Sequence, residues 1–250
     1  MKQFGLVIAV IGLAGCATVT PSPIPTETMT ATIASTPTIV WFPPTATLPP
    51  SPTVVLSATP DMRPGLGSTL LEDDFSSGEV WSLASANGSS AAVANGRLVL
   101  ALSQPTSFLF TTRQLPIFGD FYAEITASPS LCSGADEYGV MVRVTERMDY
   151  YRFSFSCDGR VRVDRIYQGA ASSPIPWMKI GAIPATAPSS SRMAVWAFRE
   201  ELRFFVNGFF LFGVRDTLLY QGALGVFVRT AGDSAITVSF TELVVREVDG

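Results

Sequence analysis

Hydrophobic and polar residues alternate along most of the chain after residue 68, and turn residues interrupt the alternation every 8–12 positions. A period of two places every second side chain on the same face of a strand. Short strands at this spacing are typical of a β-sandwich or barrel. No stretch keeps a helical period for more than two turns. We therefore expect residues 68–248 to form one all-β domain.

The strongest strand pattern lies between Tyr138 and Cys157, where two alternating segments flank a polar turn. Pairing position 145 with position 150 places the valines and aromatic residues of both segments on one face. The other face then carries polar side chains, with Arg143 directly opposite Arg152. We expect this hairpin to lie at the centre of a sheet.

Turn residues fix three further connections. Asn95-Gly96 and Asn207-Gly208 each separate two alternating segments, and Asn-Gly is the strongest short-range signal for a two-residue hairpin. We expect Asp158-Gly159-Arg160 to form a three-residue loop that leads to the next strand, with Gly159 at its left-handed position. These turns predict antiparallel neighbours.

Two features of the later strands break simple alternation. The hairpin at Asn207-Gly208 is apolar on both faces, and one face is predicted to collect Phe205, Phe210 and Phe212. This face is either covered or an exposed platform for sugar rings or a partner protein. Near the C-terminus the apolar phase shifts by one residue at Thr241-Glu242, which predicts a β-bulge.

The order of several short motifs resembles a known family. The domain opens with Leu70–Phe75 (LLEDDF) and Trp81, and Gly119–Ile125 (GDFYAEI) and Gly222–Val226 (GALGV) follow in order. This order resembles the concanavalin A-like lectin/glucanase sandwich of laminin-G-like and 3-keto-disaccharide hydrolase-like extracellular domains. The resemblance implies a two-sheet antiparallel jelly-roll sandwich. Its members include sugar-binding modules, glycosidases and protein-binding modules, so the fold alone does not select a function.

The first sixteen residues have the pattern of an export signal. Lys2 precedes an apolar stretch of 12 residues, Phe4–Gly15, which is too short to span a bilayer. The stretch ends in Leu-Ala-Gly-Cys16, which resembles the lipobox of bacterial lipoproteins. The resemblance implies cleavage before Cys16, lipidation of its thiol and anchoring to a membrane. We expect the protein at the outer face of the cell membrane, or in the outer membrane if the cell has two.

Residues 17–67 differ in composition from the rest. Between positions 17 and 64 the chain has 11 Pro, 12 Thr and 4 Ser, and only three charged residues. Such a segment cannot bury enough apolar surface to fold, and its prolines favour extended conformations. We expect a disordered linker that separates the anchor from the β domain.

Overall composition excludes several function classes. The chain has 17 basic and 21 acidic residues, a net charge of −4, which argues against nucleic acid as a partner. It contains no histidine, which excludes Ser-His-Asp and Cys-His catalysis and histidine-ligated metal sites. With Cys16 lipidated, export permits a disulfide between the two remaining cysteines, Cys132 and Cys157.

The polar face of the central hairpin is the best candidate surface for a ligand. Arginine and tyrosine can bond to hydroxyls or carboxylates and stack on sugar rings. The alternative is a solvated face in which neighbouring acids balance the arginines. Tryptophans such as Trp196 are also stacking candidates, although core positions are more common for this residue type. The candidate set is Arg143, Tyr150, Arg152, Arg162, Asp164 and Trp177.

Neither catalysis nor a metal is strongly indicated. A retaining glucanase on this fold needs two carboxylates about 5.5 Å apart, usually from one strand face. Glu124 stands alone in its strand, and the adjacent Asp136 and Glu137 should point apart. We expect no cofactor, with calcium as an alternative.

The candidate calcium ligands are oxygen donors from the start of the domain and from a late loop. They are Asp73, Asp74 and Asp233.

Three functions stay open. The first is non-catalytic binding of carbohydrate or a related extracellular polymer. The second is hydrolysis of sugars on the same fold. The third is recognition of another envelope protein through the predicted aromatic face.

Overall fold

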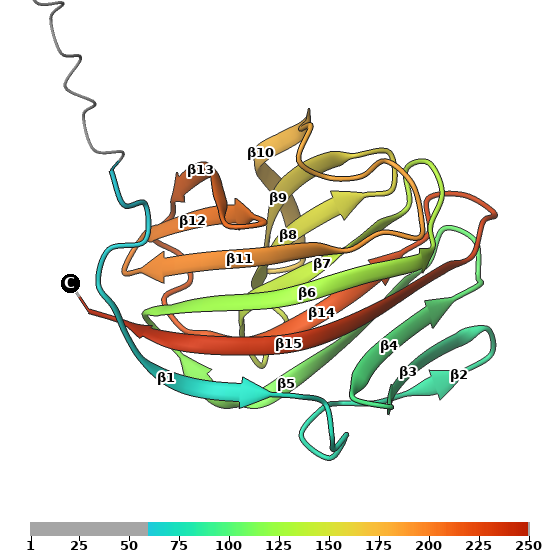
Figure 1. Cartoon of the computed structure of the whole chain (residues 1–250), viewed down its shortest axis with the longest axis horizontal. Helices are drawn as coiled ribbons and strands as arrows, with labels where there is room; N and C mark the ends of the chain where they lie inside the picture. The colour runs from blue at the N-terminus through green and yellow to red at the C-terminus, as the bar shows by residue number, and fades with distance from the viewer. Residues whose placement is uncertain (1–59, 250) are drawn as a thin grey trace, which may run out of the picture. The chain divides into compact units, whose positions relative to one another are not determined.

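A computed structural model of the chain describes residues 60–249, which form fifteen strands and no helix (Figure 1). Accordingly, none of these residues belongs to a helix with the length and apolar character to cross a membrane. The expected signal peptide at 1–16, the lipidated Cys16 and most of the linker at 17–67 lie outside the described residues. The all-β prediction is confirmed for the described part of the chain.

The strands form two antiparallel sheets. The nine-stranded sheet has the order β13-β12-β11-β6-β15-β4-β3-β2, with β1 paired to β15, and the six-stranded sheet has the order β10-β9-β8-β7-β14-β5. The strands are β1 (Leu66–Asp73), β2 (Ser85–Ala86), β3 (Ser89–Ala94), β4 (Arg97–Leu102), β5 (Phe108–Phe118), β6 (Phe121–Leu131), β7 (Glu137–Val144), β8 (Tyr150–Ser156), β9 (Arg160–Tyr167), β10 (Ala170–Lys179), β11 (Ser191–Phe198), β12 (Glu201–Val206), β13 (Phe209–Arg215), β14 (Gly222–Arg229) and β15 (Ile236–Val248).

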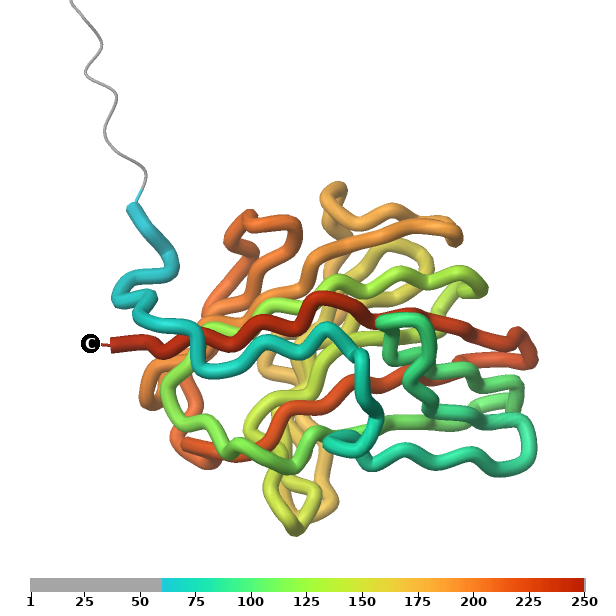
Figure 2. The backbone as a smooth tube through the Cα atoms, turned by 60° about the horizontal axis from the view of Figure 1, so that its bottom comes forward, coloured from blue at the N-terminus to red at the C-terminus, as the bar shows by residue number. Residues whose placement is uncertain are grey.

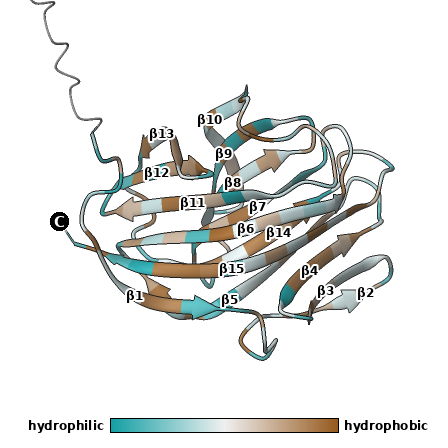
Figure 3. Cartoon of the chain, viewed as in Figure 1, coloured by the Kyte–Doolittle hydropathy of each residue, from teal (hydrophilic) through white to brown (hydrophobic). Residues whose placement is uncertain are grey.

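The two sheets pack face to face around one apolar core, which the alternation of each strand supplies. Most strands carry both hydrophobic and hydrophilic residues (Figure 3). On β8, for example, Tyr151, Phe153 and Phe155 are buried between the sheets, whereas Arg152 is on the other face. Burial of aromatic residues from both layers provides most of the driving force for this arrangement.

The turn chemistry read from the sequence is confirmed. Both residues of Asn95-Gly96 have positive φ, as do both residues of Asn207-Gly208, and each pair joins two hydrogen-bonded strands. Gly159 has φ +83° in a three-residue connection between β8 and β9. The expected bulge in β15 is present as a register shift between Thr241 and Val244.

The register predicted for the central hairpin is wrong by two residues. Val142 pairs with Tyr151 and Val140 with Phe153, so the connection from β7 to β8 is longer than expected. The turn accounts for one of the two residues, because the amide of Thr145 donates to the carbonyl of Asp149 and not to that of residue 150. A bulge in β7 accounts for the other, because the register of β7 against β14 shifts just before Val144. Arg143 lies at this bulge with φ +53°, a conformation that alternation in a sequence cannot reveal.

The predicted aromatic face of the β12–β13 hairpin is also wrong. A bulge in β13 places Phe212 opposite Phe204, and both rings pack toward the core. Phe205 and Phe210 do share the outer face, but Phe205 is buried. The three rings therefore do not form one exposed platform.

The chain before β1 is folded onto the nine-stranded sheet. Residues 62–65, which we call the N-terminal clasp, lie over the outer face of this sheet, where Met62 packs beside Trp196 and Phe205. The indole of Trp196 donates to the carbonyl of Pro64 at 3.0 Å, and Arg203 donates to the carbonyl of Met62 at 3.0 Å. The start of the described chain and the C-terminus lie at the same end (Figure 2).

The predicted disulfide joins Cys132 and Cys157, whose Cα atoms are 5.5 Å apart. It connects the loop after β6 to the end of β8. The amide of Cys157 also donates to the carbonyl of Asp136 at 2.9 Å. The bridge therefore fixes the segment that leads into β7 and its first residue, Glu137.

Candidate functional site

The outer face of the six-stranded sheet gathers most of the predicted ligand residues. Arg152 extends from β8, Arg162 and Asp164 from β9, and Trp177 from β10. Arg152, Arg162 and Asp164 alternate with residues that face the core, so the strand period alone directs them to this surface. Trp177 is in the same phase as the core-facing Ile175, and it reaches the outer face because the register of β10 shifts between Ile175 and Met178. We call it the outer sheet face.

A continuous chain of ion pairs crosses the outer sheet face. Arg152 contacts the carboxylate of Asp164 at 2.5 Å, and Arg162 contacts the same carboxylate at 3.0 Å. Arg162 also contacts Glu137 at 3.1 Å, and Arg229 contacts Glu137 at 2.5 Å. Three guanidinium groups and two carboxylates therefore alternate in sign from β14 to β8 and β9.

The acids in this chain are buried and the arginines are partly open to solvent. The side chains of Glu137 and Asp164 are each 3% exposed, against 12% for Arg152, 17% for Arg162 and 37% for Arg229. Carboxylates with guanidinium partners are held in fixed orientations by charge-assisted hydrogen bonds. Within the chain of ion pairs, the arginines are therefore more accessible to a ligand than the acids are.

Strand pairing explains why the arginines do not repel each other. Arg152 lies directly opposite Asp164 on β9, and its neighbour on β7 is Met141 rather than Arg143. The opposite charges compensate each other across the strands. The hydroxyl of Ser173 on β10 adds a hydrogen bond to Asp164 at 2.6 Å.

Aromatic rings flank the ion pairs on both sides. Phe108 and Phe110 of β5 are partly exposed, and Phe108 packs on the buried ring of Phe227. The guanidinium of Arg152 lies over Phe227, 5.2 Å from the ring centre. On the other side, Arg162 lies 4.5 Å from the ring centre of Trp177. These cation–π contacts fix both arginines against apolar surface.

Arg143 does not belong to the outer sheet face, and its assignment to the ligand site is wrong. Its bulge turns the side chain into the interior, where it is fully buried. Its guanidinium donates to the carbonyls of Leu219 at 2.8 Å and Gly119 at 3.1 Å. Burial lowers the pKa of Arg143, and the residue serves to hold two loops together.

Tyr150 lies on the outer sheet face but is almost fully covered. It packs in a small apolar cluster with Met141, Val144 and Phe227. Burial raises the pKa of its hydroxyl. Tyr150 supports the surface rather than forming its exposed part.

Five residues of the outer sheet face were missed in the sequence: Phe108, Phe110, Glu137, Phe227 and Arg229. Glu137 has the same phase as Gly139 and Met141, so strand alternation does place it on this face. Its pairing with Arg162 and Arg229 depends on which strands are neighbours in space. Gly139 leaves room for Phe227, because a Cβ there would lie 3.0 Å from the ring.

The acidic residues considered for calcium have other partners. Asp73 accepts hydrogen bonds from the indole of Trp81 at 3.0 Å and from Arg113 at 3.2 Å. Asp74 accepts from the amide and hydroxyl of Ser76, which lowers its pKa. Between residues 60 and 249, no group of three or more His, Cys, Asp or Glu side chains is close enough to hold a metal ion, so these two aspartates and Asp233 do not converge.

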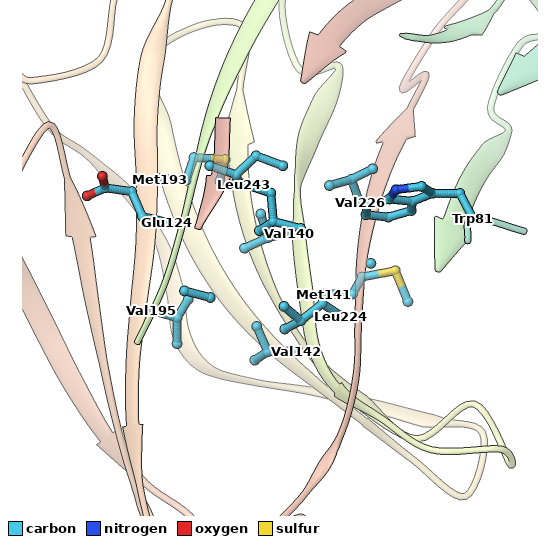
Figure 4. A pocket seen from close by; sticks show the side chains of 13 residues that line it. Trp81, Glu124, Val140, Met141, Val142, Met193, Val195, Leu224, Val226 and Leu243 are labelled. Atoms are coloured by element: carbon cyan, nitrogen blue, oxygen red, sulfur yellow. The ribbon is translucent and has the colours of Figure 1, made fainter. Parts of the chain in front are cut away.

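Glu124 lies on the opposite sheet. Its carboxylate accepts a hydrogen bond from Tyr122 at 2.7 Å and lies 3.5 Å from Arg192. In Figure 4 it points away from the apolar side chains that surround a small cavity between the sheets. That cavity, of about 20 Å³, is lined by core residues such as Trp81 and Val140. It is too small and too apolar to serve as a ligand site.

No family model matches the chain, and no curated protein matches it. Several solved structures share its fold. A carbohydrate-binding module of Bacillus subtilis has 14% identity and a TM-score of 0.52, and the match covers 67% of this chain and 96% of that one.

Two other similar structures agree in fold. The β-glucanase of Bacillus licheniformis has 11% identity and a TM-score of 0.56, covering 74% of this chain and 99% of that one. A Bacillus subtilis protein of unknown function with a galectin-like fold has 14% identity and a TM-score of 0.55, covering 74% and 99%. Together with the two-sheet topology, these likenesses show that the domain has the concanavalin A-like jelly-roll fold.

Proposed function

We propose that the outer sheet face binds an extracellular carbohydrate polymer without cleaving it. The observation that carries this proposal is the chain of ion pairs between β14 and β9, flanked by Phe108 and Phe110 on one side and Trp177 on the other. Preorganised arginines can donate to sugar hydroxyls, and partly exposed rings can stack on the apolar faces of sugars. The six strands span roughly 24 Å at about 4.8 Å per strand, room for several sugar units.

The similar solved structures support the ligand class. One is named as a carbohydrate-binding module, and others are named as glucanases. Identity to all of them is low, so the proposal rests on the residues of this chain.

The state of the acids supports binding over hydrolysis. Glycoside hydrolysis needs two carboxyl groups that reach the scissile bond. Glu137 and Asp164 are the two acids of the ion-pair chain, and both are buried and bonded to two arginines each. Neither carboxylate is free to approach a substrate in this arrangement. Hydrolysis stays the second candidate because Arg162 does bring the two acids to the same place.

The test is binding of the full-length chain carrying Cys16→Ala to a panel of soluble polysaccharides and wall glycans. We expect saturable binding that Trp177→Ala or Arg229→Ala weakens at least about tenfold, a change of about 1.4 kcal/mol. Arg192→Ala is the matched control, because this arginine lies on the opposite sheet and is 52% exposed. No binding by the folded protein to any glycan would refute the proposal. Release of reducing ends that Glu137→Gln abolishes would favour the hydrolase instead.

We also propose that the chain is a lipoprotein displayed outside the cell. The lipobox-like sequence before Cys16 and the proline-rich composition that follows it support this proposal. The experiment is metabolic labelling with an alkyne fatty acid in the source cell. We expect label on the parent chain and none on Cys16→Ala. Equal labelling of the two chains would exclude Cys16 as the anchor.

A further inference from the structure

The strands at the ends of the two sheets differ in how well they are protected. An edge strand presents unpaired amide and carbonyl groups, and proteins usually protect such edges with proline, charge or short length. Pro174 and Pro176 lie in β10, and Pro116 lies in β5. At the other end of the nine-stranded sheet, β2 has only two residues, and β1 ends in Glu72-Asp73.

The remaining edge, β13, has a bulge between Phe210 and Phe212, but it has neither proline nor a short length to protect it. Its sequence is FFLFGVR, without proline, lysine or acid, and Arg215 is its only charge. Among the described residues it pairs only with β12, so its other edge has no strand partner. Phe209 is 70% exposed and Phe210 is 38% exposed. This combination of free backbone and exposed apolar side chains is characteristic of an interaction surface.

We propose that β13 pairs with β13 of a second copy of this chain in an antiparallel, two-fold symmetric dimer. A strand that pairs antiparallel with itself is self-complementary, as a two-fold interface requires. The pairing brings no like charges together, because the single Arg215 of each strand lies opposite the phenylalanine end of its partner. The same contact type recurs within the molecule, where Arg199 lies 5.0 Å from the ring centre of Phe198.

The composition of the chain favours a second copy, and not the N-terminal segment of the same chain, as the partner of the β13 edge. Residues 17–64 contain 11 prolines in 48 positions, and proline has no amide hydrogen to donate to a strand. A β13 strand from another copy has no proline, so every amide that points to its free edge can donate.

The dimer has a consequence for binding. A two-fold axis perpendicular to the joined sheets places both six-stranded sheets on the same side of the assembly. The two outer sheet faces can then bind one polymer at the same time. Once the first face is bound, the second binds at a high effective concentration, which raises the apparent affinity. This consequence rests on the proposed function, whereas the pairing itself does not.

The test is the mass of the full-length chain carrying Cys16→Ala, measured by light scattering over a range of concentrations in a non-ionic detergent. We expect twice the chain mass of 26.8 kDa, corrected for bound detergent. Phe210→Lys places a charge on the proposed interface and should weaken dimerisation at least about tenfold. Ser172→Lys on the proline-protected edge β10 is the matched control and should dimerise like the parent. Thermal unfolding of each variant shows that it is folded.

Three outcomes overturn the proposal. The first is a parent chain that stays monomeric at every concentration. The second is a dimer that both lysine variants retain, or that only Ser172→Lys disrupts. The third is a monomer whose β13 amides are protected from hydrogen exchange, which would assign the edge to residues 1–59. Since none of these readouts uses a glycan, failure of the dimer and failure of carbohydrate binding are distinguishable.

Discussion

Glu137 is the acid on which the chain of ion pairs depends most. Its carboxylate is 3% exposed and contacts Arg162 at 3.1 Å and Arg229 at 2.5 Å. Substitution Glu137→Ala leaves both guanidinium groups without this partner and opens a small void under them. We expect the protein to fold with lower stability and to lose the fixed orientation of both arginines.

The expected loss of stability comes from the two ion pairs that the substitution removes. Each charge-assisted hydrogen bond contributes about 1.5 kcal/mol or more. Breaking a fully buried pair costs about 3–5 kcal/mol, but Arg162 and Arg229 are 17% and 37% exposed and can turn to solvent. We therefore expect the free energy of unfolding to fall by about 3 kcal/mol. For a domain of this size, that corresponds to a fall in Tm of about 6–12 °C.

The assay is urea and thermal unfolding of the parent and the variant, followed by circular dichroism. Glu242→Ala is the control, because this carboxylate is 67% exposed and its contact with Arg192 is 3.9 Å long. We expect that control to change stability by less than about 0.5 kcal/mol. A loss below about 1 kcal/mol for Glu137→Ala would show that these ion pairs contribute no more than surface contacts do, contrary to this prediction.

Three further predictions concern other parts of the domain. Replacing both Cys132 and Cys157 with serine reopens a loop of 25 residues and should cost about 3 kcal/mol in urea unfolding, according to the chain-entropy model. A chain of residues 66–250 lacks the N-terminal clasp, and its free energy of unfolding should be lower than that of residues 57–250 by about 2 kcal/mol, because hydrogen bonds and apolar contact are lost. Burial, and then a hydrogen bond to a neighbouring glutamate, raise the pKa of Tyr122 from 10.0 to about 12. Because the folded-state pKa of Tyr122 is raised, its protonated hydroxyl contributes to the stability of the folded protein. This contribution is complete below pH 10 and is lost as the pH rises from 10 to about 12.

Each of these predictions has a direct check. Equal unfolding midpoints for the reduced and oxidised parent would contradict the role of the disulfide. The truncated chain is compared with Met62→Ala in the longer chain, which removes one clasp side chain and should show a smaller loss. For the tyrosine, Tyr122→Phe should lose less stability than the parent between pH 10 and 12, and parallel curves would contradict the pKa shift.

The sequence was sufficient for the fold class and for much of the outer sheet face. Strand alternation places Arg152, Arg162 and Asp164 on one surface, because side-chain direction in a regular strand depends only on phase. Trp177 reaches the same surface through register shifts in β10, which alternation does not reveal. Asn-Gly pairs locate two hairpins for an equally local reason, the need for positive φ at both positions. These predictions required no knowledge of distant contacts.

The errors have a common cause. The bulges at Arg143 and in β13 each insert one residue and reverse the faces that follow, and alternation gave no sign of either. The pairing of Glu137 with Arg229 joins residues 92 positions apart, so it depends on the order of strands in the sheet. We expected the folded part to start at residue 68, because residues 62–65 have the composition of the linker. In the structure these residues contact the nine-stranded sheet at Trp196.

Hydrogen–deuterium exchange with and without a bound polysaccharide shows directly whether carbohydrate binds on the outer sheet face. The full-length chain carrying Cys16→Ala is used, with the glycan that binds best in the panel. We expect slower exchange in β8, β9, β10 and the start of β7, with β6, β11 and β15 unchanged. Protection confined to β6, β11 or β15 would contradict it, because the ligand would then lie on the opposite sheet.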